Sequence, residues 1–143
     1  MCKPRLCSNE TYIFARDVVI MVRWLKERLG FAGYDPDSWR VPYVDLRRDG
    51  LRLKIMNCRE IERARPLPKG SIAGPVEYSF PVDGLREFRA ELESRRTQCT
   101  EIREDGPGRH CFLIEDPERN QWKFWQRQRA MKSRPSPKGG PSN

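Results

Sequence analysis

The sequence predicts an α+β fold in which one unit of strand, helix and hairpin occurs twice. Apolar residues recur at helical spacing between Asp17 and Gly30, and alternating residues flank a turn at Asp49-Gly50. The same order of strand, helix and hairpin returns about 68 residues later in the chain. Because neither copy could bury its own sheet face alone, the repetition indicates that the two copies pack together.

The first copy starts with a β-prone run at residues 11–16, which an amphipathic helix follows. Asp17 is expected to cap the N-terminus of this helix, and Gly30 is expected to end it. The apolar positions recur along one side of the helix: Val18, Met21, Val22, Leu25 and Leu29. We therefore expect this side to be buried.

A hairpin of two strands, residues 41–47 and 51–56, comes next. One face of the hairpin is apolar and is expected to pack under the helix. The other face is polar, yet it carries Tyr43 and Met56. A polar face with aromatic content suits a ligand cavity, and it is also typical of a sheet that is half exposed to solvent.

The second copy repeats this order. A strand is predicted at residues 76–82, and Asp83 is expected to cap a second helix. The apolar side of that helix is marked by three residues: Leu85, Phe88 and Leu92. A hairpin follows, with strands at 109–115 and 120–126 around a turn at 116–119.

These elements predict a single domain at residues 10–126, with modules at about 10–57 and 75–126. Residues 58–74 are expected to be a connector, and residues 1–9 are expected to be a flexible N-terminus. With 143 residues, the chain is long enough to bury a core that needs no disulfide or metal for stability.

The net charge of +8 is concentrated at the ends of the chain. Residues 127–143 carry five basic residues and no acid, and they are rich in Pro, Gly and Ser. They are predicted to form a disordered basic tail. Such a tail either adds weak, salt-sensitive contact with nucleic acid or is only a solubilising end.

The five cysteines are an odd number without tight spacing, and residues 1–9 contain no apolar segment of a secretory signal. We therefore expect a reduced, cytoplasmic protein without a disulfide framework. No apolar run approaches the roughly 20 residues of a membrane span, so no membrane contact is expected.

Three motifs occur in order along the chain: Asp17-Val18 with Trp24-Leu25 and Leu29-Gly30-Phe31, then Val82-Asp83-Gly84-Leu85 with Phe88 and Leu92, then Asp116-Pro117-Glu118-Arg119-Asn120. Together they resemble the signatures of the vicinal oxygen chelate superfamily, the glyoxalase, bleomycin-resistance and dioxygenase group. One departure is Arg119, where the family usually has glycine. If this position requires a positive φ, arginine costs about 1 kcal/mol there.

The resemblance implies two βαβββ modules whose mixed sheets form a concave groove for a ligand. In metal-dependent relatives the metal ligands lie on the first and last strands of each module. The matching positions in this sequence are Glu10, Lys54, Glu77 and Lys123. Because a lysine ammonium has no lone pair to donate, we expect no metal and no other cofactor. Glutamate–lysine pairs are expected to fill that space, unless the lysines are ordinary exposed strand residues.

His110 is the only histidine, so a Cys–His dyad would need a cysteine nearby. Cys111 is adjacent in a strand, and its side chain therefore points to the opposite face. No catalytic residue is predicted. The residues expected to bind a ligand combine groove aromatics with charged groups: Glu10, Tyr12, Trp39, Tyr43, Arg52, Lys54, Glu77, His110, Lys123 and Trp125.

The resemblance is nearest to the metal-free members that are like bleomycin-resistance proteins, which form homodimers with drug grooves shared between subunits. It therefore implies a binding protein that sequesters an aromatic antibiotic or a related compound. The basic candidates for the groove wall disfavour bleomycin itself, since that drug is cationic. The alternative is a metal-dependent enzyme of the same superfamily: a lyase, isomerase, dioxygenase or thiol transferase.

Overall fold

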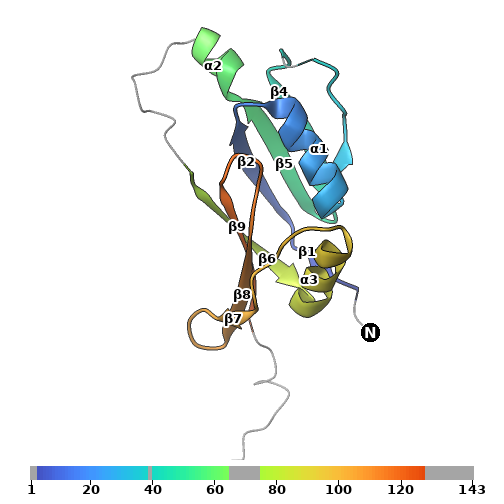
Figure 1. The fold of residues 1–143 in the computed structure, drawn as a ribbon, viewed down its shortest axis with the longest axis vertical. Coiled ribbons are helices and arrows are strands. Elements are labelled where there is room, and N and C mark those ends of the chain that lie inside the picture. The colour runs from blue at the N-terminus through green and yellow to red at the C-terminus, as the bar shows by residue number, and fades with distance from the viewer. Residues whose placement is uncertain (1–2, 39, 65–74, 128–143) are drawn as a thin grey trace, which may run out of the picture.

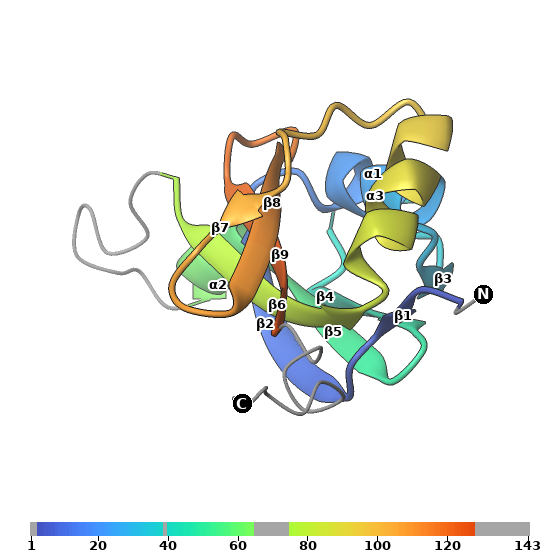
Figure 2. The same cartoon turned by 90° about the horizontal axis from the view of Figure 1, so that it is seen from below.

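The computed structural model describes residues 3–38, 40–64 and 75–127. They form two mixed β-sheets with helices α1 (Val18–Leu29) and α3 (Leu85–Ser94). Figure 1 shows α1 running along the sheet of the first module and α3 next to the sheet of the second. The two helices are neighbours in Figure 2, and hydrogen bonds between their C-terminal segments join the two modules along this helical layer.

The first module has the strand order β2-β5-β4-β3. Its strands are β2 (Asn9–Ala15), β3 (Ala32–Gly33), β4 (Tyr43–Arg48) and β5 (Leu51–Asn57). β2 pairs in parallel with β5, whereas β4 is antiparallel to both β5 and β3. The predicted hairpin around the Asp-Gly turn is therefore confirmed.

The second module has the order β1-β6-β9-β8-β7. Its strands are β1 (Arg5–Leu6), β6 (Glu77–Asp83), β7 (Arg103–Glu104), β8 (Arg109–Glu115) and β9 (Gln121–Arg127). As in the first module, the leading strand β6 is parallel to the last strand β9, and the hairpin β8–β9 is antiparallel. The predicted repetition of strand, helix and hairpin is confirmed.

The capping of α1 agrees with the prediction. The Asp17 carboxylate accepts a hydrogen bond from the Ile20 amide at 3.1 Å. Gly30 ends the helix with a φ of 75°, a left-handed conformation that glycine adopts without steric cost. The predicted apolar side is fully buried against the sheet.

The predicted cap of α3 is wrong. The N-cap residue is Gly84, with a φ of 78°, and it makes no side-chain cap. Asp83 is instead the last residue of β6, and its carboxylate oxygen lies 3.9 Å from a guanidinium nitrogen of Arg5. The Leu85 amide donates to the side-chain oxygen of Gln126 at 2.9 Å, so the capping group comes from the last strand.

Residues 1–9 are not simply a flexible end. From residue 3 onward they are described, and β1 pairs antiparallel with β6. Leu6 is only 1% exposed, and its amide donates to the Asp49 carboxylate at 2.9 Å. The physical reason is that β6 offers an unpaired edge to which this short apolar segment adds a strand.

The connector also contains a helix that the sequence analysis did not predict, α2 (Cys58–Ala64). It follows β5 directly, and the Asn57 side-chain oxygen accepts from the Arg59 amide at 3.1 Å. Asn57 therefore acts as an N-terminal cap at the end of a strand. Residues 65–74 of the connector, Trp39 and the predicted tail from residue 128 onward lie outside the described residues.

Aromatic side chains from the second module form the centre of the core. Trp122 is completely buried and lies 5.6 Å from the Trp24 ring of α1, so the core is continuous between the modules. Phe88 and Phe112 pack against Phe124 on the same side of the sheet. Within the described residues, no helix is both long and apolar enough to cross a membrane.

The β8–β9 turn is organised by the carboxylate of Asp116, which is 4% exposed. It accepts from the amides of Glu118 and Asn120, from the Asn120 side chain and from the indole of Trp122, all at 2.8–2.9 Å. Arg119 has a φ of 69°, so the position does require the left-handed region that favours glycine.

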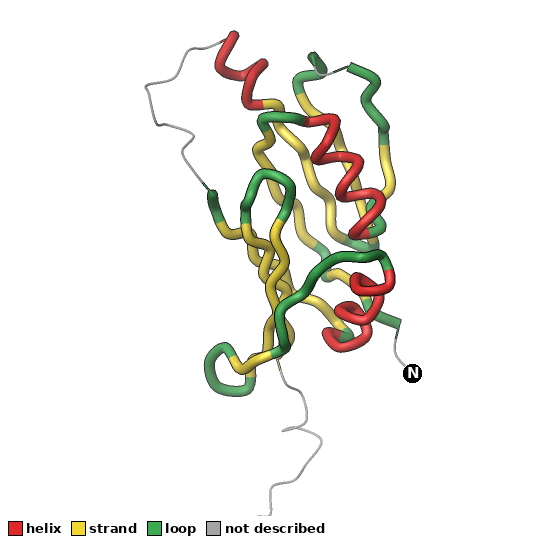
Figure 3. The backbone as a smooth tube through the Cα atoms, viewed as in Figure 1, coloured by secondary structure: helices red, strands yellow, loops and turns green. Residues whose placement is uncertain are grey.

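Glu118 connects this turn to the other module. Its carboxylate accepts hydrogen bonds of 2.9–3.0 Å from the amides of Arg16 and Asp17, which precede α1. Figure 3 shows the turn, in green, beside the start of that helix. The modules are thus fixed to each other by a polar contact between segments about one hundred residues apart.

Candidate functional site

The sheet of the first module has one face buried under α1 and one face free of any described helix or strand. We call the second face the open face of the first sheet. It consists of alternate residues of three strands: Glu10, Tyr12 and Phe14 of β2, Tyr43, Asp45 and Arg47 of β4, and Arg52, Lys54 and Met56 of β5. Their alternation with buried residues confirms the predicted period of two.

Lys54 is central in this face. It lies opposite Tyr12 on one side and Asp45 on the other. Its ammonium nitrogen is 4.5 Å from the ring centroid of Tyr43 and 6.0 Å from that of Tyr12. Both distances fall in the range of cation–π attraction, so the two tyrosines hold the amine between them.

Three aromatic rings on this face remain largely accessible. Tyr12, Phe14 and Tyr43 are 51%, 41% and 46% exposed. Clusters of exposed aromatic residues are uncommon on isolated proteins and mark places where a ligand or partner is bound. Flat rings suit this face because they can pack on planar side chains at small entropic cost.

Lys54 has no acidic partner among the residues that the structure describes. Among the described residues, no carboxylate oxygen lies within 4.0 Å of its ammonium nitrogen. The residues outside the described ranges contain no Asp or Glu. Within the described part of the chain, the tyrosine rings are thus the groups that interact with the charge of Lys54.

The open face of the second sheet is defined in the same way, by alternate residues of β6, β8 and β9. Lys123 lies there between Ser79 and Leu113. Unlike Lys54, it forms an ion pair: its ammonium nitrogen is 2.6 Å from the Asp105 carboxylate. The hydrogen bond with Asp105 raises the pKa of Lys123, and the same bond lowers the pKa of Asp105.

A second cation is held on this face. The guanidinium of Arg109 lies 4.0 Å above the ring of Trp125, and its Nε atom is 3.6 Å from Asp105. Asp105 thus serves both Lys123 and Arg109. On this face the cations of Lys123 and Arg109 and the ring of Trp125 are therefore engaged by side chains of the same chain.

The four positions that match metal ligands in relatives do not fit a divalent metal. Two of them are lysines, and among the described residues neither Glu10 nor Glu77 belongs to a group of three or more potential metal ligands. Over residues 3–38, 40–64 and 75–127, no cluster of three or more His, Cys, Asp or Glu side chains is present. The positive charge of a protonated lysine amine would also repel a divalent cation bound beside it.

The expected glutamate–lysine pairs are not formed. Lys123 pairs with Asp105, and the ion pairs of the described residues include neither Glu10 nor Glu77. The reason is the turn between β7 and β8, which brings Asp105 over the strand face and supplies a closer carboxylate.

The structure places most of the predicted ligand-binding residues on the two open faces and His110 elsewhere. Five of them share the open face of the first sheet: Glu10, Tyr12, Tyr43, Arg52 and Lys54. Glu77, Lys123 and Trp125 lie on the open face of the second sheet. His110 alternates with Cys111 and so lies on the opposite face of β8, opposite Gln126.

Two residues of these faces were missed by the sequence analysis. Phe14 follows Tyr12 by two positions, so strand alternation alone would have placed it on the same face. Asp105 precedes Gly106-Pro107-Gly108, a composition typical of a tight turn. That signal predicts a turn, but it does not reveal which strand residue the aspartate meets.

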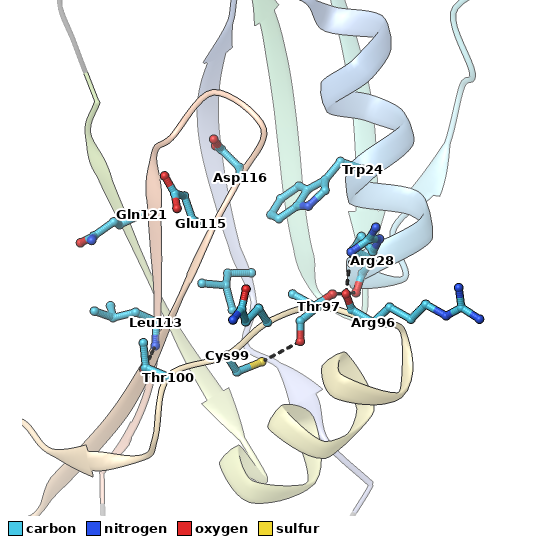
Figure 4. A pocket seen from close by; sticks show the side chains of 12 residues that line it. Trp24, Arg28, Arg96, Thr97, Cys99, Thr100, Leu113, Glu115, Asp116 and Gln121 are labelled. Carbon is cyan, nitrogen blue, oxygen red and sulfur yellow. Dashed lines mark hydrogen bonds between the residues drawn. The ribbon is translucent and has the colours of Figure 1, made fainter.

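A cavity of about 650 Å³ opens on the helical side, between Trp24 and Arg28 of α1, the segment 96–100 and the end of the β8–β9 hairpin (Figure 4). Its only thiol is Cys99, which lies 3.6 Å from the Thr97 carbonyl oxygen. Burial raises the pKa of Cys99 to about 11, so the thiol stays protonated and weakly nucleophilic at neutral pH. The Asp116 carboxylate at its edge is fully engaged by the turn.

Sequence comparison finds no matching family profile and no matching curated protein. Comparison of structures does find similar proteins. A lactoylglutathione lyase from Agrobacterium tumefaciens superposes with a TM-score of 0.65 and 18% identity, covering 82% of this chain and 90% of that one. A glyoxalase/bleomycin resistance protein/dioxygenase from Nocardioides gives a TM-score of 0.65 and 13% identity, covering 97% and 89%.

A bleomycin-binding protein in complex with bleomycin is also similar. It gives a TM-score of 0.60 and 18% identity, covering 85% of this chain and 99% of that chain. At such identities the likeness establishes the fold, and it agrees with the repeated module derived from the sequence. The chain therefore has the α+β fold of the glyoxalase, bleomycin-resistance and dioxygenase proteins, as the resemblance to the vicinal oxygen chelate superfamily implies.

Proposed function

We propose that this protein binds a small aromatic compound on the open face of the first sheet and acts by sequestering it. The compound is an aromatic antibiotic or a molecule of similar shape. In this proposal the protein is a cytoplasmic homodimer, in which a second copy covers the open face and completes a groove, and it uses no metal.

The observation that carries the proposal is the group of exposed rings around Lys54. Tyr12, Phe14 and Tyr43 come from two strands of one face, and each is more than 40% exposed. Ligand pockets combine such apolar and aromatic surface with a few polar groups that orient the ligand. The open face of the first sheet has both components.

The comparison with solved structures gives independent support. One similar structure is a bleomycin-binding protein with bleomycin bound. Bleomycin itself does not suit the charges here, because Arg47, Arg52 and Lys54 outnumber Glu10 and Asp45 on the open face. A neutral or anionic aromatic compound is the better match.

An enzyme is the second candidate, because a lactoylglutathione lyase is among the similar structures. The side chains of the open face favour binding over catalysis. The positions that match metal ligands include two lysines, and the described thiols have pKa values raised by burial. Neither observation supplies an activated nucleophile or a Lewis acid.

A native mass spectrum of the purified protein, without added metal or ligand, tests the proposal first. We expect the mass of a metal-free dimer, with or without a co-purified small molecule. A stoichiometric divalent ion would overturn the metal-free proposal and make metal-dependent assays the next step. A monomer at micromolar concentration would remove the second copy from the groove.

Binding is tested by a thermal-shift screen of aromatic antibiotics, followed by titration of each compound that binds. Tyr43→Ala is expected to weaken binding about tenfold through the loss of one ring contact. Tyr34→Ala is the matched control, because Tyr34 is an exposed tyrosine outside the three strands of the face. If both variants bind as the wild type does, the ligand does not occupy the open face.

A further inference from the structure

Lys54 and Lys123 hold the same place in the two modules. Each lies on the last strand of its module, which is parallel to the module's leading strand. Lys54 is in register with Tyr12 and Asp45, and Lys123 is in register with Ser79 and Leu113. The molecule therefore contains two versions of one lysine site, and they can be compared directly.

In the second module the site is occupied by a carboxylate of the same chain. Asp105 lies 2.6 Å from the Lys123 ammonium nitrogen, and the aromatic ring of Trp125 lies two residues farther along the strand. A carboxylate, a lysine and an aromatic ring are thus brought together on an open sheet face. The Asp105 side chain marks where an anion binds in this arrangement.

In the described residues of the first module, no carboxylate forms an ion pair with Lys54. β7 pairs near the start of β8, so its turn folds over the strand that carries Lys123. β3 pairs instead near the end of β4, at Leu46 and Arg47, so the connection from β3 does not begin beside Lys54. Asp45 is the register neighbour of Lys54, yet the two side chains form no ion pair.

We propose that Lys54 binds the carboxylate of an aromatic acid, in the place that Asp105 takes on Lys123. This inference rests on the proposed function and specifies its ligand class. The apolar part of the acid packs on Tyr12, Phe14 and Tyr43, and the carboxylate accepts a charge-assisted hydrogen bond from the lysine. The exposed cations Arg47 and Arg52 give the face a net positive charge, which also favours an anionic ligand.

The test measures three naphthalene probes by isothermal titration calorimetry with the full chain. They are naphthalene-2-carboxylate, 2-naphthylmethanol and 2-naphthylmethylammonium, which share one ring system and differ in charge. We expect the carboxylate to bind about tenfold more tightly than the alcohol, because a hydrogen bond to a charged group contributes about 1.5 kcal/mol or more. The ammonium is expected to bind most weakly.

Lys54→Met keeps the length of the side chain and removes its charge. We expect it to abolish the preference for the carboxylate while leaving the alcohol's affinity nearly unchanged. Lys123→Met is the matched control, since Lys123 is already engaged by Asp105, and it is expected to keep the preference. Circular dichroism of both variants verifies that they are folded.

The outcomes separate this inference from the proposed function. If all three probes bind with equal affinity and Tyr43→Ala weakens each, the aromatic site stands and the carboxylate class is wrong. If the ammonium binds most tightly, Glu10 and Asp45 define the ligand and the inference is overturned. If no probe binds at millimolar concentration, the proposed function fails together with the inference.

Discussion

The two modules repeat one order of strands and helix, but their open faces differ. On the second sheet the central lysine, a neighbouring arginine and a tryptophan are engaged by Asp105 and by one another. On the first sheet the central lysine lies against tyrosine rings that remain about half exposed, and it forms no ion pair with a described residue. The buried faces of the two sheets share one apolar pattern, whereas the open faces differ: one pairs its charges internally and the other leaves its rings accessible.

The hairpin turns differ in a comparable way. The second module uses the Asp116 carboxylate to satisfy four donors in a buried turn. The first uses a short turn in which Asp49, with a φ of 56°, accepts one bond from the Leu6 amide. Disrupting the turn of the second module is therefore expected to lower the free energy of unfolding more than disrupting the turn of the first.

Asp116→Ala is expected to have the largest effect on stability. It leaves buried donors, including the indole of Trp122, without an acceptor, so we expect a loss of about 3 kcal/mol in the free energy of unfolding. Asp49→Ala removes the hydrogen bond from the Leu6 amide and an ion pair with Arg48 at 3.4 Å, and it is expected to lose about 1 kcal/mol. Urea denaturation followed by tryptophan fluorescence measures both, and equal losses would contradict the contrast between the turns.

A smaller effect is expected where the modules are joined by an ion pair. Arg48 of β4 lies 2.7 Å from Glu91 of α3, and Arg95 lies 3.1 Å from the same carboxylate. Burial on its own raises the pKa of Glu91, but hydrogen bonds and charges of the two arginines outweigh it, and the pKa lies below the usual 4.5.

Since the folded-state pKa of Glu91 is lower than the unfolded one, its stabilisation is present above pH 4.5 and is lost as the pH falls through the folded value. Glu91→Gln is expected to lower stability at pH 7 by about 1 kcal/mol, after allowance for partial exposure. The difference from wild type should shrink below pH 4. A difference that is constant from pH 7 to pH 3 would show that the charge is not responsible.

Arg119→Gly tests the strained turn directly. Arg119 has a φ of 69°, where glycine has no steric penalty. We expect a net gain of about 0.5 kcal/mol, because the relief of strain is offset by the larger entropy of glycine in the unfolded chain. Thermal unfolding of Arg119→Gly beside Arg119→Ala separates backbone strain from side-chain loss, since only the glycine variant is expected to be more stable than wild type.

The smallest effect is expected from a substitution that makes the open face of the second sheet resemble that of the first. Asp105→Asn removes the anion from Lys123 and is expected to create a second, weak carboxylate site there. Calorimetric titration with naphthalene-2-carboxylate is expected to show a stoichiometry above that of the wild type. The substitution Asp105→Asn is also expected to lower the pKa of Lys123, which NMR titration of its side chain measures. Unchanged stoichiometry would mean that the two lysine sites are not equivalent.

The elements that the sequence predicted well are those with local signals. The helix between Asp17 and Gly30 has caps and a clear apolar side, and the hairpins have alternation and turn residues. The same alternation placed Tyr43 and Lys54 on one face. These patterns depend only on residues close in sequence, and so they can be read without a structure.

The features that the sequence did not predict depend on distant partners. β1 forms because β6 has a free edge, and α3 is capped by Gln126 of the last strand. The ion pair of Asp105 with Lys123 requires the register of β7 on β8. The residues next to a segment in sequence do not reveal such distant pairings. For that reason the sequence predicts a cap of α3 at Asp83, and this prediction is wrong.

The bond between Glu118 and the amides before α1 has a consequence for the order of folding on the ribosome. The residue that completes the start of the first helix is synthesised about one hundred positions later than the helix itself. The N-terminal strand β1 likewise pairs with β6, which is synthesised later. During synthesis the first half of the chain therefore lacks these contacts. We therefore expect the contacts between the modules to form only after the last hairpin has been synthesised.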